Sequence, residues 1–248
     1  MVILEELKNH NVTFEPGDVT VIGGCRAMGK TTFALNLVFD IAMNDQKHRV
    51  ERKIFYYSAE DTVEYLSDRF HTMKEAREDG YMLPKGCEYL CACDYVTSES
   101  FDISSCIAEA ISRMCKKNKG NIVIVDCCQS MDAIIDNVIF DVKKKAKRHG
   151  LHVILISQLS QKHINLRAGH LPIIEDLDRT DLMELYADQV LLLHRPEYYN
   201  KGDSPGLMNV LVAKNKGIYT IGPPESMKFN VQMNTGAIFK EKKIHHRW

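Results

Sequence analysis

The sequence predicts an α/β fold with a mostly parallel central sheet, helices on both faces of that sheet and a β-rich C-terminal end. Short apolar segments alternate with amphipathic segments up to residue 193, as strands and covering helices do in parallel sheets. A glycine-rich turn follows the first apolar segment and leads directly into a helical run, which is typical of a phosphate-binding loop. Three later apolar segments, broken by glycines and Pro223-Pro224, predict the β-rich end.

The apolar runs predict the positions of the strands. We expect strands at residues 19–22, 53–58, 88–93, 121–126, 151–158 and 190–193, and in the β-rich end at 208–214, 226–231 and 237–240.

Helices are expected where apolar residues recur at helical spacing. The first covers residues 33–38 and follows the glycine-rich turn, while a polar loop at 160–174 and one more helix precede the strand at 190. The apolar stripes of the other helices are Val63, Leu66, Phe70 and Met73, then Ile103, Ile107, Ile111 and Met114, then Ile135, Val138, Ile139 and Val142.

Length and composition favour one domain. The chain has 248 residues, of which 45% are hydrophobic and 26% are charged, as in ordinary globular proteins. Its net charge of −1 provides no overall basic field for nucleic acid. No apolar run is long enough to cross a membrane, and the N-terminal residues do not form a secretion signal. We therefore expect a single domain over residues 1–248, located in the cytoplasm.

The glycine-rich turn carries the strongest chemical signal. In a phosphate-binding loop, backbone N–H groups cradle the β-phosphate, Lys30 reaches the β- and γ-phosphate oxygens, and the Thr31 hydroxyl holds Mg²⁺. The alternative is a glycine-rich turn that binds nothing. The expected nucleotide-binding residues are Gly24, Cys25, Arg26, Ala27, Met28, Gly29, Lys30, Thr31 and Thr32.

Three polar residues follow the ends of predicted parallel strands, where ligands bind in such sheets. Asp126 is expected to hold the water shell of Mg²⁺, Glu60 to polarise a water that attacks the γ-phosphate, and Gln158 to sense that phosphate. Each residue has a simpler alternative. Glu60 would favour a helix N-terminus, Asp126 would be a strand-end acid without metal, and Gln158 would be a satisfied amide at a sheet edge.

Two other clusters have plainer interpretations. Cys87, Cys91 and Cys93 suggest zinc, but no second Cys or His pair stands at zinc-finger spacing, so we expect buried thiols. The eight cysteines of the chain suit a reducing compartment. The basic run at residues 143–148 is expected to be a solvated face that complements a helix C-terminus, with a nucleic-acid patch as the alternative.

Several segments agree in order and spacing with one known family. They are Gly17 to Gly24 with Met28 to Ala34, Ser58-Ala59-Glu60, residues 122–131, Ser157 to Ser160, and Asp176 to Tyr199. Together they resemble the RecA-like ATPase domain of DnaB-type replicative helicases over nearly the whole chain. The resemblance implies a RecA-like P-loop NTPase fold in which Glu60 is the catalytic base, Asp126 ends the Walker B strand, Gln158 is the sensor and Arg195 contacts the nucleotide.

The resemblance also implies partners. Such domains form rings, usually hexamers, with ATP between neighbours, and a basic residue of one subunit reaches the γ-phosphate held by the next. The matching stretch is Lys214-Asn215-Lys216-Gly217, where Lys216 replaces the usual arginine and lacks its planar fork. Single-stranded DNA and other replication proteins are the implied partners. The expected DNA contacts, in a loop that is otherwise a mobile surface segment, are Lys162, His163, Arg167 and His170.

The chain also departs from this family. We expect no N-terminal primase-binding domain, because the first strand already begins at residue 19. The segment after Asp126 is shorter, and residues 177–181 differ from the usual Leu-Arg-Glu-Ser-Gly. The expected function is a Mg²⁺-dependent ATPase ring motor on single-stranded DNA. The alternative is a regulatory or loader-like ATPase that controls assembly with a protein partner without unwinding, and a small-molecule kinase ranks last.

Overall fold

The computed structural model describes residues 1–50, 52–58, 61–77, 90–92, 122–126, 135–177, 185–220 and 226–241, with the backbone alone at 90–92 and 135–139. Within these residues the strands form a single sheet in the order β10-β9-β7-β6-β1-β5-β4-β2-β3, with β8 beside β7. Strands β1 to β6 pair in parallel, whereas β7 to β10 pair antiparallel. The predicted mostly parallel sheet with a β-rich C-terminal end is confirmed.

The strands lie close to their predicted positions, except for the short strand β8, which was not predicted. The parallel strands are β1 (Val19–Gly24), β2 (Ile54–Ser58), β3 (Leu90–Ala92), β4 (Ile122–Asp126), β5 (His152–Gln158) and β6 (Gln189–His194). The antiparallel strands are β7 (Leu207–Asn215), β8 (Ile218–Tyr219), β9 (Ser226–Gln232) and β10 (Ala237–Lys240). Every residue of β1, β4 and β6 is buried, which explains their continuous apolar sequences.

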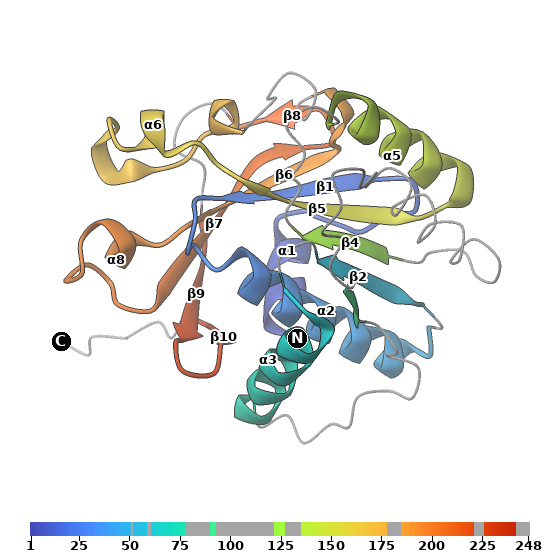
Figure 1. Ribbon diagram of the computed structural model, residues 1–248, viewed down its shortest axis with the longest axis horizontal. Coiled ribbons are helices and arrows are strands. Elements are labelled where there is room, and N and C mark those ends of the chain that lie inside the picture. Colours follow the sequence, from blue (N-terminus) through green and yellow to red (C-terminus); the bar gives the residue numbers. More distant parts are fainter. Residues whose placement is uncertain are drawn as a thin grey trace.

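Helices cover both faces of the sheet. Figure 1 shows α5 on one side and α1, α2 and α3 on the other, with α6 and α8 at one end. Their bounds are α1 (Val2–Asn9), α2 (Lys30–His48), α3 (Val63–Ala76), α5 (Ile135–His149), α6 (Gln161–Ile164) and α8 (Pro196–Tyr199). None of the helices in these described ranges is both long and apolar enough to span a membrane.

The N-terminal helix α1 was not predicted, because its stabilising contacts come from distant residues. Ile3, Leu4 and Leu7 are buried, and the Asp40 carboxylate of α2 accepts hydrogen bonds from the backbone N–H groups of Ile3 (2.6 Å) and Leu4 (3.1 Å). An acceptor at this end satisfies amides that have no partner within the helix and suits its dipole. Arg77, at the end of α3, pairs with the same carboxylate at 2.8 Å. One buried acid therefore connects α1, α2 and α3.

The polar loop predicted at residues 160–174 is more ordered than expected. It contains α6 and the 3₁₀ turns η2 (Ala168–His170) and η3 (Ile174–Asp176). Ile164 is buried beneath it, and Arg167 forms a bidentate ion pair with Asp176, with N–O distances of 2.5 and 2.6 Å. The helix predicted at 103–114, most of the segment before β6, Cys87 and Cys93 lie outside the described residues.

The basic run at residues 143–148 belongs to α5. Val142 and Ala146 are buried, whereas Lys144, Lys147 and Arg148 are exposed. Lys143 pairs with Asp188 and donates to the Gly17 carbonyl at 2.9 Å. The lysines and the arginine of the run therefore lie outside the buried face of a core-packed helix, which is consistent with both sequence interpretations.

His152, at the start of β5, is buried in the sheet. Its ring nitrogens lie 2.9 Å from Thr20 Oγ1 and 3.0 Å from the Glu15 carbonyl oxygen, and Phe14 packs edge-on against the ring. Burial is the main cause that lowers the pKa of His152 from 6.5 to about 4. The folded protein therefore holds this imidazole neutral at pH values where the unfolded chain already binds a proton.

We expect the free energy of unfolding to decrease as the pH falls from 6.5 to 4, with about 3 kcal/mol of that decrease due to His152. The contribution is fully present above pH 6.5 and is lost towards pH 4, because only the unfolded chain takes up the proton in this window. Urea unfolding at several pH values measures it. His152→Gln should show a shallower decrease, whereas replacement of the exposed His71 should keep the parental slope. Equal slopes for all three proteins would contradict the assignment.

Candidate nucleoside triphosphate site

The phosphate-binding loop runs from the end of β1 into the first turn of α2. Gly29 has φ +86°, and a Cβ atom there would lie 2.9 Å from Met208 Cε, so both the backbone conformation and the packing favour glycine. Ala27 also adopts a positive φ of 63°. At Gly24 a Cβ atom would meet Leu193, Lys30 and Met28 at 3.3 Å each. The backbone therefore turns sharply where only small residues fit.

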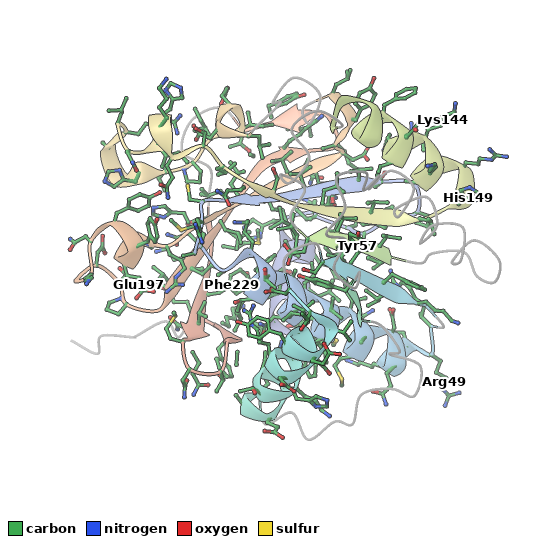
Figure 2. All side chains as sticks on the ribbon, in the orientation of Figure 1. Arg49, Tyr57, Lys144, His149, Glu197 and Phe229 are labelled. Carbon is green, nitrogen blue, oxygen red and sulfur yellow. The ribbon has the colours of Figure 1, made fainter. Side chains whose placement is uncertain are left out.

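The hydrophobic core holds this loop in place. Met28 is buried at the turn, and its backbone N–H donates to the Cys25 carbonyl at 3.2 Å. Phe33, in the first turns of α2, packs edge-on against Phe229 of β9 with ring centroids 6.3 Å apart, and Figure 2 labels Phe229 in the interior. A loop fixed on both sides loses little conformational entropy when it binds a ligand.

The N-terminus of α2 points into the candidate site. Gly29 is its N-cap residue and has no side chain that would cover the first turn. Backbone N–H groups and the helix dipole at such an end favour an anion. The Lys30 ammonium donates to the Cys25 carbonyl at 3.1 Å. Its positive charge therefore lies over the phosphate-binding loop.

The candidate metal ligands meet beside this helix. Thr31 Oγ1 donates to Asp126 Oδ2 at 2.8 Å, and the Tyr56 hydroxyl donates to the same oxygen at 2.5 Å. Burial and the neighbouring Asp126 raise the pKa of Tyr56 well above 10, so its hydroxyl keeps its proton. In the described ranges no three His, Cys, Asp or Glu side chains gather as a metal site. The two oxygen ligands fit Mg²⁺, which commonly completes its shell with phosphate oxygens and water.

Strand order brings Gln158 to the same place. Gly24 and Gln158 are direct neighbours at the ends of β1 and β5, and Ser58 and Asp126 are neighbours at the ends of β2 and β4. The carboxyl ends of these strands surround a cavity of about 530 Å³. It is lined by Arg26, Ala27, Gly29, Lys30, Thr31, Thr32, Arg69, Asp126, Gln158 and Arg195. The predicted metal and sensor residues thus meet most of the phosphate loop in one cavity, whereas Gly24, Cys25 and Met28 do not line it.

Two arginines extend this cavity. Arg69 of α3 donates to Thr32 Oγ1 at 2.8 Å, and the sequence interpretation did not include it. Arg195 precedes α8, where it pairs with Glu197 and lies 3.0 Å from Met233 Sδ; Glu197 is labelled in Figure 2. Burial lowers the pKa of Arg195.

A second cavity of about 380 Å³ adjoins the first and shares with it Gly29, Thr32, Arg69 and Arg195. Its remaining lining is more apolar and includes Tyr65, Met208, Val231 and Met233. A polar, cationic cavity continued by a less polar one matches the two ends of a nucleotide, the phosphates and the nucleoside. The apolar stripe of α3 was predicted from the sequence. The contribution of other α3 residues to the lining of this cavity was not predicted.

Some predicted residues lie elsewhere. Glu60 lies outside the described residues, two positions beyond Ser58 at the end of β2. Lys214 is buried with its ammonium 5.2 Å from the Tyr219 ring centroid, and Lys216 lies 3.6 Å from Asp18. The Lys216 N–H donates to the Asp188 carbonyl, and the Asp188 N–H to that of Val19. Lys214 pairs with Val190 of β6, which pairs with Val21 in the middle of β1. Lys216 is level with the beginning of β1, about 17 Å along the strand from the phosphate loop.

The four predicted DNA-contacting residues fall into two groups. Lys162 and His163 are exposed on α6. Arg167 is held by Asp176, and His170 stacks on Tyr199 of α8 with ring centroids 4.3 Å apart. Tyr199 in turn donates to Cys25 Sγ of the phosphate loop at 3.8 Å. His170 therefore connects the segment after Gln158 to the candidate site through Tyr199, whereas Arg167 stabilises that segment internally.

Comparison with known proteins shows which family this chain resembles. The family described as "DnaB-like helicase C terminal domain" matches residues 2–235. A probable plasmid replicative DNA helicase of Chlamydia psittaci is 25% identical over 85% of this chain and 49% of its own length. The replicative DNA helicase DnaB of Rickettsia bellii is 28% identical over 77% of this chain and 44% of its own length. The chain spans about half the length of these curated relatives.

Solved structures share the fold. A DnaB-like replicative helicase, described with its interactions with primase, superposes with a TM-score of 0.73 at 22% identity, over 96% of this chain and 61% of its own. A second solved structure, described as an ATPase domain, gives 0.72 at 21% identity, over 96% of this chain and 89% of its own. The RadB recombinase gives 0.61 at 18% identity and 96% coverage of both. The predicted RecA-like fold is confirmed.

Arg69 should contribute to nucleotide affinity. We expect Arg69→Ala to weaken binding of a fluorescent ATP analogue by about 10- to 100-fold, since hydrogen bonds to charged groups contribute about 1.5–3 kcal/mol. Arg69→Lys should recover only part of the affinity, because lysine keeps the charge without the planar fork. Lys74→Ala removes a positive charge from the same helix outside both cavities and should bind normally. Parental affinity of Arg69→Ala would show that this side chain does not contact the ligand.

Proposed function

The chain belongs to the family of DnaB-like helicase C-terminal domains, and on that premise we propose that it is a Mg²⁺-dependent ATPase of a ring motor that moves on single-stranded DNA. The observation that supports this proposal best is the cavity at the N-terminus of α2. Lys30, Thr31, Asp126 and Gln158 meet there from the ends of three parallel strands. A cationic loop, a carboxylate and an amide at one helix N-terminus are the parts that phosphoryl transfer needs.

The phosphates would occupy the first cavity. Backbone N–H groups at the start of α2 would hold the β-phosphate, and Lys30 would exchange its bond to the Cys25 carbonyl for the β- and γ-phosphate oxygens. Thr31 and Asp126 would hold Mg²⁺, which supplies charge neutralisation when bound. The nucleoside would extend into the second cavity, past Arg195.

Hydrolysis needs a base and a way to detect the γ-phosphate. In our proposal Glu60 accepts a proton from the attacking water as the water oxygen bonds to the γ-phosphorus and the bond to the ADP oxygen breaks. Glu60 follows Ser58, which is the strand neighbour of Asp126. Gln158 lines the cavity and begins the segment that leads to α6, so its amide is suited to report the phosphate to that segment.

The position of Lys216 supports the proposed assembly. Lys216 lies at the opposite end of β1 from the phosphate loop of its own chain, whereas Lys214 is level with the middle of that strand. If Lys216 acts on the γ-phosphate, it must act in a neighbouring copy, as the proposed ring requires. Lysine provides charge without arginine's bidentate geometry, so we expect less stimulation between subunits than an arginine would give.

DNA would be contacted by α6, where Lys162 and His163 are exposed. Contacts of this kind neutralise phosphates without recognising sequence. Because we propose that the protein acts on DNA, we also propose that it is located in the cytoplasm.

A loader-like or regulatory ATPase that acts on a protein partner is our second candidate. It is favoured by one observation, the engagement of Arg167 and His170 in contacts within the chain. Both remaining contacts with DNA would then come from a single short helix.

Hydrolysis tests the proposed site. Lys30→Ala should lower the rate of ATP hydrolysis by at least about 100-fold, because it removes the positive charge that would stabilise the negative charge of the transferred phosphate. Glu60→Gln should lower it by about 100- to 10,000-fold, the usual contribution of a general base, while binding a fluorescent ATP analogue within a few-fold of the parent. Phosphate release and analogue binding measure the two effects. A Glu60→Gln protein that hydrolyses ATP at the parental rate would exclude Glu60 as the base.

DNA stimulation separates the two candidate functions. On the motor proposal, single-stranded oligonucleotide should increase the rate of hydrolysis, and the increase should weaken steeply with salt. The double substitution of Lys162 and His163 by alanine should remove most of the increase and leave the basal rate unchanged. Lys144→Ala, on α5 (Figure 2), removes a charge elsewhere and should have no effect. Hydrolysis without any response to DNA would favour the loader-like function.

A further inference from the structure

Tyr56 is a buried polar residue to which the proposed chemistry gives no role. Its side chain is 1% exposed, and its hydroxyl donates to Asp126 Oδ2 at 2.5 Å. Tyr56 lies on β2 and Asp126 on the adjacent β4, two residues further along the strands. The ring therefore reaches along one face of the sheet to place its hydroxyl at the edge of the cavity.

One carboxylate oxygen of Asp126 accepts hydrogen bonds from two other side chains. Tyr56 donates to Asp126 Oδ2, and Thr31 Oγ1 donates to it at 2.8 Å. Rotation of the carboxylate would break both hydrogen bonds. A threonine hydroxyl has one proton and two lone pairs. Because its proton points to Asp126, the lone pairs of Thr31 are available to a cation in the cavity.

We propose that Tyr56 is a positioning residue for the divalent cation that accompanies the nucleotide. This inference rests on the proposed function, because it takes Thr31 and Asp126 as the metal-binding pair. Tyr56 fixes the rotation of the Asp126 carboxylate, and the carboxylate fixes the direction of the Thr31 hydroxyl. The Tyr56 hydroxyl remains a donor to Asp126 when the cation binds.

The physical basis is the orientation of metal ligands by groups that do not touch the metal. Loss of such a supporting hydrogen bond typically reduces metal affinity or activity by about 10- to 100-fold. A buried tyrosine is well suited to this role, because packing fixes its ring while its hydroxyl remains a strong donor. A phenylalanine at this position would fill nearly the same volume and leave the carboxylate without this donor.

The test is metal binding by Tyr56→Phe. Mn²⁺ has a paramagnetic signal and serves as the probe, with ADP present at saturation. We expect the dissociation constant of Mn²⁺ to increase about tenfold, measured by the decrease of its free EPR signal. Binding of ADP without metal should be unchanged. A purely structural role for Tyr56 would instead lower the unfolding temperature without a specific effect on the metal.

Tyr57→Phe is the matched control. It removes the same hydroxyl from the next residue of β2, which is also buried and is labelled in Figure 2. Its side chain points to the opposite face of the sheet, because neighbouring residues of a strand alternate. We expect parental affinity for Mn²⁺. Unfolding temperatures of both variants show whether each protein is folded.

Two further variants separate the possible failures. Thr31→Ala and Asp126→Asn remove the proposed metal ligands themselves. If both weaken Mn²⁺ binding and Tyr56→Phe does not, the role of Tyr56 is excluded and the metal site stands. If none of the three weakens binding, the metal site is wrong and the inference falls with it. Equal weakening by Tyr56→Phe and Tyr57→Phe would also overturn the specific role of Tyr56.

Discussion

The parallel pairing of β1, β5, β4 and β2 determines where every candidate ligand-binding group lies. Residues far apart in the sequence, Gly24, Gln158, Asp126 and Ser58, become neighbours because these strands end at the same edge of the sheet. The core of buried aliphatic side chains fixes that register. The phosphate loop and the N-terminus of α2 are then held against this edge. The geometry of the cavity is therefore a consequence of strand order.

The sequence was sufficient for the parts of the fold whose signals are local. The phosphate loop, the strands and the antiparallel end have strong apolar patterns and turn residues, and they lie where we expected them. Helix α1 escaped prediction because Asp40, 37 residues away from Ile3, supplies its N-terminal hydrogen bonds. The turns between residues 160 and 176 depend in the same way on the ion pair of Arg167 with Asp176.

The candidate site shows the same division. Lys30, Thr31, Asp126 and Gln158 could be named from motifs because their spacing carries the chemistry. Tyr56 and Arg69 could not, since one appeared to be an ordinary strand residue and the other a charge beside a helical stripe. Their partners, Asp126 and Thr32, are reached only after the strands and α3 have been placed. Supporting residues of this kind depend on tertiary contacts and leave little trace in a single sequence.

If Lys216 completes the site of a neighbouring copy, as we propose, its separation from the phosphate loop of its own chain limits how copies of this chain can combine. A two-fold symmetric dimer buries the same patch on both partners, whereas completion of one site by its neighbour needs two different patches to meet. The contact must then be heterologous. Each copy would place the turn between β7 and β8, which carries Lys216, against the phosphate loop of one neighbour, and its own phosphate loop would be contacted by the other neighbour. Such contacts either close by rotation or continue as an open helix. Every site is completed only in the closed form, while an open chain of copies always leaves one terminal site unfinished.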